Sequence, residues 1–165
     1  MRISRLLFTA TLLTLLGGYS LAAQAADRDI KVTSIAEVEV VTPGKDGNKT
    51  VKRVPAEKAV PGTEVVFTNK FENVGNKTAN EIVIDNAIPN YTIYKAGSTF
   101  GKDTVAVFSA DGGKTFDAAD KLTIQGADGV RRNALPNEYT HIRWTYTGQL
   151  PPGKTGEVGF RAAIK

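Results

Sequence analysis

The chain has 165 residues, with 21 lysine and arginine residues against 17 aspartate and glutamate residues, one histidine and no cysteine. This length predicts a single folded domain, and a composition of 41% hydrophobic and 23% charged residues argues against a disordered or fibrous chain. The absence of cysteine excludes disulfide scaffolds, thiolate metal sites, a cysteine nucleophile and an acylated lipoprotein cysteine. One histidine leaves little room for histidine-based metal sites or catalysis.

Residues 1–25 have the three parts of a secretory signal peptide. Arg2 and Arg5 form a basic start, residues 6–16 form an apolar run, and Ala23-Gln24-Ala25 matches a cleavage site. We therefore predict cleavage after residue 25.

The alternative for this leader is a membrane anchor. A membrane-spanning helix needs roughly 20 apolar residues, and the apolar run ends at Gly17 after eleven. We predict that residues 26–165 form one domain, with no membrane span once the leader is removed. The leader places that domain in the periplasm, on the cell surface or in the medium.

The charge of the mature domain bears on its partners. Without Arg2 and Arg5 there are 19 basic and 17 acidic residues, so the formal net charge falls from +4 to +2. The adjacent basic pairs are Lys52-Arg53 and Arg131-Arg132, and the other cations are scattered. This is not the basic footprint of a nucleic-acid-binding protein, so we expect no nucleic-acid partner.

Alternation with a period of two residues, bounded by Gly, Pro, Asn and Asp clusters, predicts β-strands throughout the mature domain. A first strand begins at Ile30 and is expected to shift near Ser34, after which Val38 and Val40 share a face opposite Glu37 and Glu39. The turn-rich residues 42–49 lead to a returning strand at 50–54, whose basic residues suit cross-strand pairs with those glutamates. We interpret these pairs as stabilising.

Further short strands bring the predicted total to eight or nine, the spacing of an antiparallel β-sandwich. Trp144 alternates in phase with Ile142 and Tyr146, so we expect it to lie in the core between two sheets. These strands lie around residues 64–72, 82–84, 91–94, 105–108, 122–124, 142–146 and 158–164.

Five ordered elements over residues 61–164 resemble a bacterial cell-envelope repeat, the "domain of unknown function eleven" family. They are a strand opened by Pro61-Gly62, the turn Asn73–Ala79, the corner Val83–Pro89, the triplet Ala96-Gly97-Ser98, and Leu150–Gly153. The resemblance implies an immunoglobulin-like sandwich outside the cytoplasmic membrane, here in one copy. It implies no catalytic residue and no cofactor. The side chains of Asn73, Asn76 and Asp85 can hydrogen-bond neighbouring backbone, and we expect them to fix these corners.

Residues 109–116, Ser-Ala-Asp-Gly-Gly-Lys-Thr-Phe, match the Asp-box pattern S-x-D-x-G-x-x-F. This motif occurs in sialidase propellers and in other secreted β-proteins. A sialidase needs several blades and far more chain. We therefore expect a hairpin staple in which the Asp111 carboxylate accepts backbone N–H bonds and Phe116 packs beneath.

No set of residues predicts catalysis. Five aspartates provide ligands that calcium prefers, but their spacing does not fit the calcium-loop pattern. They are Asp103, Asp111, Asp117, Asp120 and Asp128. We assign no catalytic, cofactor or metal residues. We leave open whether a calcium ion is present, or a Lys–Asn isopeptide bond at Lys70 or Lys31.

The sequence thus predicts a non-enzymatic module with a structural or protein-interaction role, whose partner is a protein or a glycan. Binding would use an exposed sheet edge or the loop region 109–138. A carbohydrate-binding or glycan-processing protein is the first alternative, with sugar rings stacking on Tyr91, Tyr94 and Tyr139. A surface subunit that polymerises edge to edge is the second. The candidate partner-binding residues of the loop region are Lys114, Asp117, Asp120, Arg131 and Arg132.

Overall fold

The structure, a computed structural model, describes residues 29–43 and 48–165. The predicted signal peptide, residues 1–25, lies outside the described residues. The described residues form eleven strands. The sequence predicted eight or nine, because β6 and β9 are too short to show alternation. The elements are β1 (Ile30–Pro43), β2 (Lys49–Pro55), β3 (Glu64–Asn73), β4 (Ala79–Ala87), β5 (Thr92–Tyr94), β6 (Phe100–Gly101), β7 (Thr104–Ser109), β8 (Thr123–Gln125), β9 (Arg131–Asn133), the 3-10 turn η1 (Pro136–Glu138), β10 (His141–Leu150) and β11 (Thr155–Ile164).

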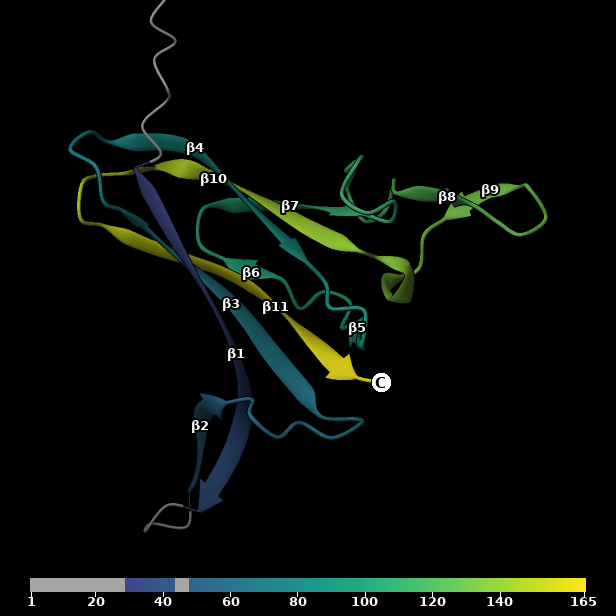
Figure 1. The fold of residues 1–165 in the computed structure, drawn as a ribbon, viewed down its shortest axis with the longest axis horizontal. Helices are drawn as coiled ribbons and strands as arrows, with labels where there is room; N and C mark the ends of the chain where they lie inside the picture. Colours follow the sequence, from purple (N-terminus) through teal and green to yellow (C-terminus); the bar gives the residue numbers. More distant parts are fainter. Residues whose placement is uncertain (1–28, 44–47) are drawn as a thin grey trace, which may run out of the picture.

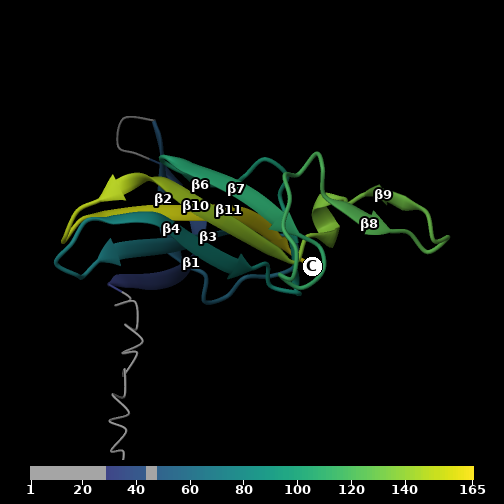
Figure 2. The same cartoon turned by 90° about the horizontal axis from the view of Figure 1, so that it is seen from above.

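The strands form two antiparallel sheets that face each other as a sandwich, which confirms the predicted fold class (Figure 1). The larger sheet has the order β2-β1-β3-β11-β5, with β6 also pairing β11, and the smaller has the order β4-β10-β7. The sheets lie close together at the β3–β4 and β10–β11 turns and diverge toward the opposite end (Figure 1). Strands β8 and β9 form a separate hairpin that projects from one end of the molecule (Figure 2).

Apolar side chains that alternate along the facing strands fill the space between the sheets. Trp144 is 1% exposed, as predicted, and its ring stacks on Phe160 with 6.3 Å between centroids. An aromatic cluster of Tyr94, Phe108 and Tyr139, with centroids 4.9 to 5.8 Å apart, lies beside it in the same core.

The turn chemistry expected from the sequence is confirmed at Asn73. Its side-chain amide donates to the carbonyls of Lys77 and Leu150, both at 2.7 Å, and its Oδ1 accepts from the N–H of Gly75 at 3.0 Å. Asn73 therefore ties the β3–β4 turn to the end of β10. Gly153, in the next turn, has a φ of 71°, which glycine adopts without strain.

The predicted shift near Ser34 is wrong, because β1 is one continuous strand. Ser34 stays in register opposite Asn69, and its hydroxyl donates to the Asn69 side-chain oxygen at 2.6 Å. The strand changes partner instead of phase: residues 30–38 pair with β3 and residues 37–43 pair with β2. Residues 37–43 and β2 thus form a two-stranded ribbon, which we call the arm, that projects from the sandwich (Figure 1).

Candidate interaction surface

Residues 109–138, the region favoured by the sequence, form a lobe at the end of the molecule that carries the β8–β9 hairpin (Figure 2). At its base the Asp-box closes as predicted. Oδ1 of Asp111 accepts from Ser109 Oγ at 2.7 Å and from the N–H groups of Lys114 and Thr115, both at 3.0 Å. The hydroxyl and N–H of Thr115 and the hydroxyl of Ser109 hold the pKa of Asp111 well below its usual range.

The aromatic residue of the Asp-box does not enter the core. Phe116 lies under the guanidinium of Arg143, with 3.9 Å between the guanidinium carbon and the ring centroid. Arg143 also forms two hydrogen bonds to Asp85, at 2.7 and 2.8 Å, which hold the pKa of that carboxyl below its usual value. Asp85 was expected to bind neighbouring backbone at a corner. It instead pairs with Arg143 across the β4–β10 ladder.

All five predicted partner-binding residues are exposed in this lobe, and two of them have internal roles. Arg132 forms two hydrogen bonds to Glu138, at 2.8 and 2.6 Å, and these hold the pKa of Glu138 at about 2. Asp117 accepts the N–H of Ala118, and its own backbone bridges to Phe108. Lys114 lies in the Asp-box turn, and Arg131 lies in β9. The backbone carbonyl of Asp120 accepts a hydrogen bond from the side chain of Asn133, in the same strand.

The arm is the most exposed apolar element of the fold. Every residue of β2 is exposed, and Val41 and Val51, which lie opposite each other, are 56% and 55% exposed. On the other face of the ribbon, Val54 lies opposite Val38 and Lys52 opposite Val40. A two-stranded ribbon of this kind has no core of its own, so its conformation depends on what anchors it.

The outer edge of β2 presents free backbone groups. Backbone groups of successive residues in an antiparallel ladder point to alternate sides. The Ala56 N–H donates to the Ala36 carbonyl at 3.0 Å, which sets the phase of the β1–β2 ladder. Val51 and Arg53 therefore direct their N–H and C=O groups away from β1, and no strand in the described part of the chain pairs with that edge.

The edges at β5, β7 and β4 are short, covered or irregular. Strand β5 has three residues, and β7 is bridged at Phe108 by Asp117. Strand β4 carries Glu81 in the left-handed region, with φ of 50°, opposite a register shift in β10. Such irregularities hinder the addition of a strand, whereas the register of β1 and β2 is unbroken over seven pairs.

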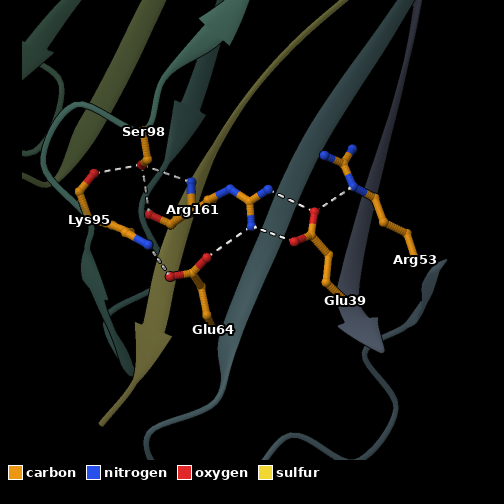
Figure 3. Close-up of polar contacts among 6 residues, drawn as sticks. All are labelled: Glu39, Arg53, Glu64, Lys95, Ser98 and Arg161. Atoms are coloured by element: carbon orange, nitrogen blue, oxygen red, sulfur yellow. Dashed lines mark hydrogen bonds and ion pairs between the residues drawn. The ribbon is translucent and has the colours of Figure 1, made fainter. Parts of the chain in front are cut away.

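A chain of five charged residues, which we call the latch, anchors the arm to the sandwich. Arg161 of β11 reaches across β3 to Glu39, with Nη–Oε distances of 2.7 and 3.0 Å, and also contacts Glu64 at 2.9 Å (Figure 3). Arg53 adds a bond to Glu39 at 3.2 Å and Lys95 one to Glu64 at 2.6 Å. The latch thus joins β2, β1, β11 and β3 on the outer face of the larger sheet.

Neighbouring groups fix the latch and set its charge states. Ser98 accepts the Arg161 N–H at 3.0 Å and donates to the Lys95 carbonyl at 2.6 Å (Figure 3). The Arg161 hydrogen bonds hold the pKa of Glu39 at about 2. Hydrogen bonds from Lys95 and Arg161 lower the pKa of Glu64, and both glutamates raise the pKa of Arg161. Glu39, Glu64 and Arg161 are therefore all charged at neutral pH.

A pocket of about 270 Å³, lined mostly by apolar residues, opens at the base of the arm. Residues that follow β2 form one wall, and the ends of β3 and β11 form the floor. Tyr91, which is 57% exposed, stands at its rim. The pocket is lined by Ala36, Ala56, Glu57, Ala59, Val65, Phe67, Tyr91 and Ile164.

Two of the three tyrosines proposed for sugar stacking are buried. Tyr94 and Tyr139 belong to the core cluster, and only Tyr91 is exposed. Among the described residues no group of three metal-ligating side chains comes together. The same part of the chain contains no helix long and apolar enough to cross a membrane. Lys31 and Lys70, the lysines considered for an isopeptide bond, are both exposed.

Sequence reasoning paired the basic and acidic residues of the arm but did not identify its anchor. The Glu39–Arg53 register was predictable from the short turn between their strands. Arg161 lies 122 positions from Glu39, and nothing local to either residue signals the contact.

No family model matches the chain, and no curated protein matches it. The family resemblance drawn from the five sequence elements therefore stays a prediction. A solved structure, a family 3a carbohydrate binding module from the cipA scaffolding of Clostridium thermocellum, has 11% sequence identity and a TM-score of 0.30. The alignment covers 81% of this chain and 76% of that chain, and similarity at this level carries no argument about function.

Proposed function

We propose that this chain is a non-enzymatic, extracytoplasmic interaction module that binds an extended segment of a partner protein along the free edge of β2. The observation that carries the proposal is the arm: a ribbon with exposed valines on both faces and an unpaired outer edge, held in place by ion pairs. An added strand gains main-chain hydrogen bonds from such an edge and side-chain contacts from its two faces.

The latch supports this role because it orders the arm before a partner arrives. An arm held only by its own ladder would lose conformational freedom on binding, and that loss weakens affinity. The bonds from Glu39 to Arg161 and Arg53 remove part of this cost in the free protein. Exposed valines on a pre-ordered edge are typical of an interaction site.

Glycan binding has less support from the surface. Sugar-binding faces use exposed aromatic rings, and of the tyrosines considered for this role only Tyr91 is exposed. A panel of soluble glycans should therefore leave the melting temperature unchanged. A shift with any of them would favour the carbohydrate-binding alternative.

The proposal is tested by shortening the arm. Residues 41–51 are replaced by Asn-Gly, which closes a two-residue hairpin between Val40 and Lys52. The tagged chain is then purified from the producing cells, and its co-purifying proteins are quantified by mass spectrometry. We expect the shortened arm to lose the partner that the intact chain retains.

The matched control places alanine at all five lobe residues: Lys114, Asp117, Asp120, Arg131 and Arg132. This variant keeps the arm and should keep the partner. If the lobe variant loses the partner and the arm-shortened variant retains it, the interaction surface lies in the lobe and not on the arm.

A further inference from the structure

The free edge of β2 is basic as well as apolar. The strand carries Lys49, Lys52 and Arg53 and no acidic residue. Arg53 is committed to Glu39 in the latch. Neither Lys49 nor Lys52 has an ion-pair partner among the described residues, and both are exposed.

The register of the arm places these charges next to valines on both faces. Lys52 lies on the same face as Val54, and Lys49 lies on the opposite face with Val51. A strand added to the edge therefore meets one lysine and one valine on each of its faces. Cross-strand neighbours determine which sequences pair well.

A second copy of this chain fits the edge poorly. Antiparallel self-pairing must place outward-facing residues opposite one another. Centred on Val51 it sets Lys49 opposite Arg53, centred on Lys52 it sets Lys52 opposite itself, and centred on Arg53 it sets two arginines together. Like charges directly opposite each other destabilise the pair in every one of these registers.

We infer that the edge of β2 selects an acidic extended peptide, with carboxylates opposite Lys49 and Lys52 and apolar side chains opposite Val51 and Val54. In the antiparallel orientation the amino end of the peptide reaches the base of the arm. There the pocket beside Ala56 and Ala59 can take one apolar side chain. This inference rests on the proposed function and adds the chemical class of the partner.

Synthetic peptides test the inference on the full mature chain. The acidic probe begins with phenylalanine and then repeats Val-Thr-Glu, which sets glutamates opposite Lys49 and Lys52 and valines opposite Val51 and Val54; a matched probe has glutamine at every glutamate. Binding is measured by fluorescence anisotropy in 50 mM salt, where we expect the acidic probe to bind about tenfold more tightly than the glutamine probe. Its affinity should fall in 0.5 M salt, because salt screens the charges.

A charge reversal sharpens the test. Lys49→Glu with Lys52→Glu should abolish the preference for the acidic probe and create one for a lysine probe of the same pattern. Lys102→Glu with Lys154→Glu changes the net charge equally at exposed lysines away from the arm and should leave the preference intact. Equal loss in both variants would show attraction to the overall charge and overturn the inference.

The remaining outcomes separate the two proposals. Equal binding of the acidic and glutamine probes, lost when the arm is shortened, would overturn the acidic selection and leave strand addition standing. If both probes bind with dissociation constants weaker than micromolar, an acidic peptide is not the partner. The proposed function is then still tested by the co-purification experiment with the arm-shortened variant. A concentration-dependent dimer lost on arm shortening would assign the edge to a second copy instead.

Discussion

Arg161 determines the position of the arm because its guanidinium joins two glutamates from different strands. It is about one-quarter exposed, and its contacts with Glu39 have bidentate geometry. A hydrogen-bonded charge pair in a partly buried setting is worth more than a fully exposed one. Removing Arg161 also leaves Glu39 and Glu64 without their shared cation.

The variant Arg161→Met tests this contribution. We expect a loss of about 1–2 kcal/mol in the free energy of unfolding, together with at least tenfold faster amide exchange in the arm. Urea denaturation and hydrogen exchange measure the two effects. Arg143→Met is the control, because it removes a comparable bidentate pair from the other sheet. Equal acceleration of arm exchange in both variants would contradict the role of the latch.

The ionisation of Glu39 gives the latch a predicted pH dependence. Its pKa is about 2 in the folded chain, against an ordinary value of 4.5, because it accepts hydrogen bonds from Arg161 and Arg53. A carboxyl whose pKa is lowered by folding stabilises the fold above its unfolded pKa and loses that effect as pH falls toward its folded pKa. The contribution is thus complete above about pH 5 and fades between pH 4.5 and 2.

Glu39→Gln should therefore destabilise the chain at pH 7 and converge with the unmodified protein near pH 2. Urea midpoints measured at half-unit pH steps give this difference directly. A stability difference that stays constant from pH 7 to pH 2 would show that Glu39 acts through packing and not through its charge.

At the scale of the element, the arm is separable from the sandwich. Its second strand is exposed throughout, while the core residues Trp144 and Phe160 lie between the sheets. Surface segments without buried contacts contribute little to global stability. The arm-shortened variant should therefore keep a melting temperature within about 5 °C of the intact chain. Val66→Ser, at a fully buried position, is the sensitivity control and should lower it by more. A collapse of the shortened variant would show that the arm is part of the folding unit.

The sequence predicted elements whose signals are local. Alternation located the longer strands. Asn73 and Asp111 close their turns as expected, because the hydrogen bonds that do so join residues at most four positions apart. Strand β6 has two residues, too few for a period to appear.

Burial and long-range contacts were not predictable in the same way. Tyr94 and Tyr139 were assigned to the surface because single tyrosines in short segments have no pattern to show which way they face. The fold places both in the core. The candidate site was predicted only in part. An exposed sheet edge was expected, but its assignment to β2 depends on β1 pairing with β3 along one half and with β2 along the other.

At the scale of the whole molecule, the basic edge of β2 favours a monomer. The antiparallel registers of β2 with itself that are centred on Val51, Lys52 or Arg53 set cations opposite one another, and Lys49 and Lys52 are exposed. Sedimentation equilibrium in 0.15 M salt should give the monomer mass across a hundredfold range of concentration. Replacing both lysines with glutamine removes the like-charge pairs from the registers centred on Val51 and Lys52, and should promote dimers. A dimer of the unmodified chain at micromolar concentration would contradict this account.

The arm and the lobe project from different parts of the molecule (Figure 1), so one experiment can tell them apart. A photo-reactive residue is placed at Val51 on the edge of β2 or at Val130 in the lobe, two exposed valines, and irradiated in the producing cells. We predict cross-linked adducts with a second protein from position 51 and none from position 130. Adducts from position 130 alone would contradict the central claim that the arm is the interaction surface.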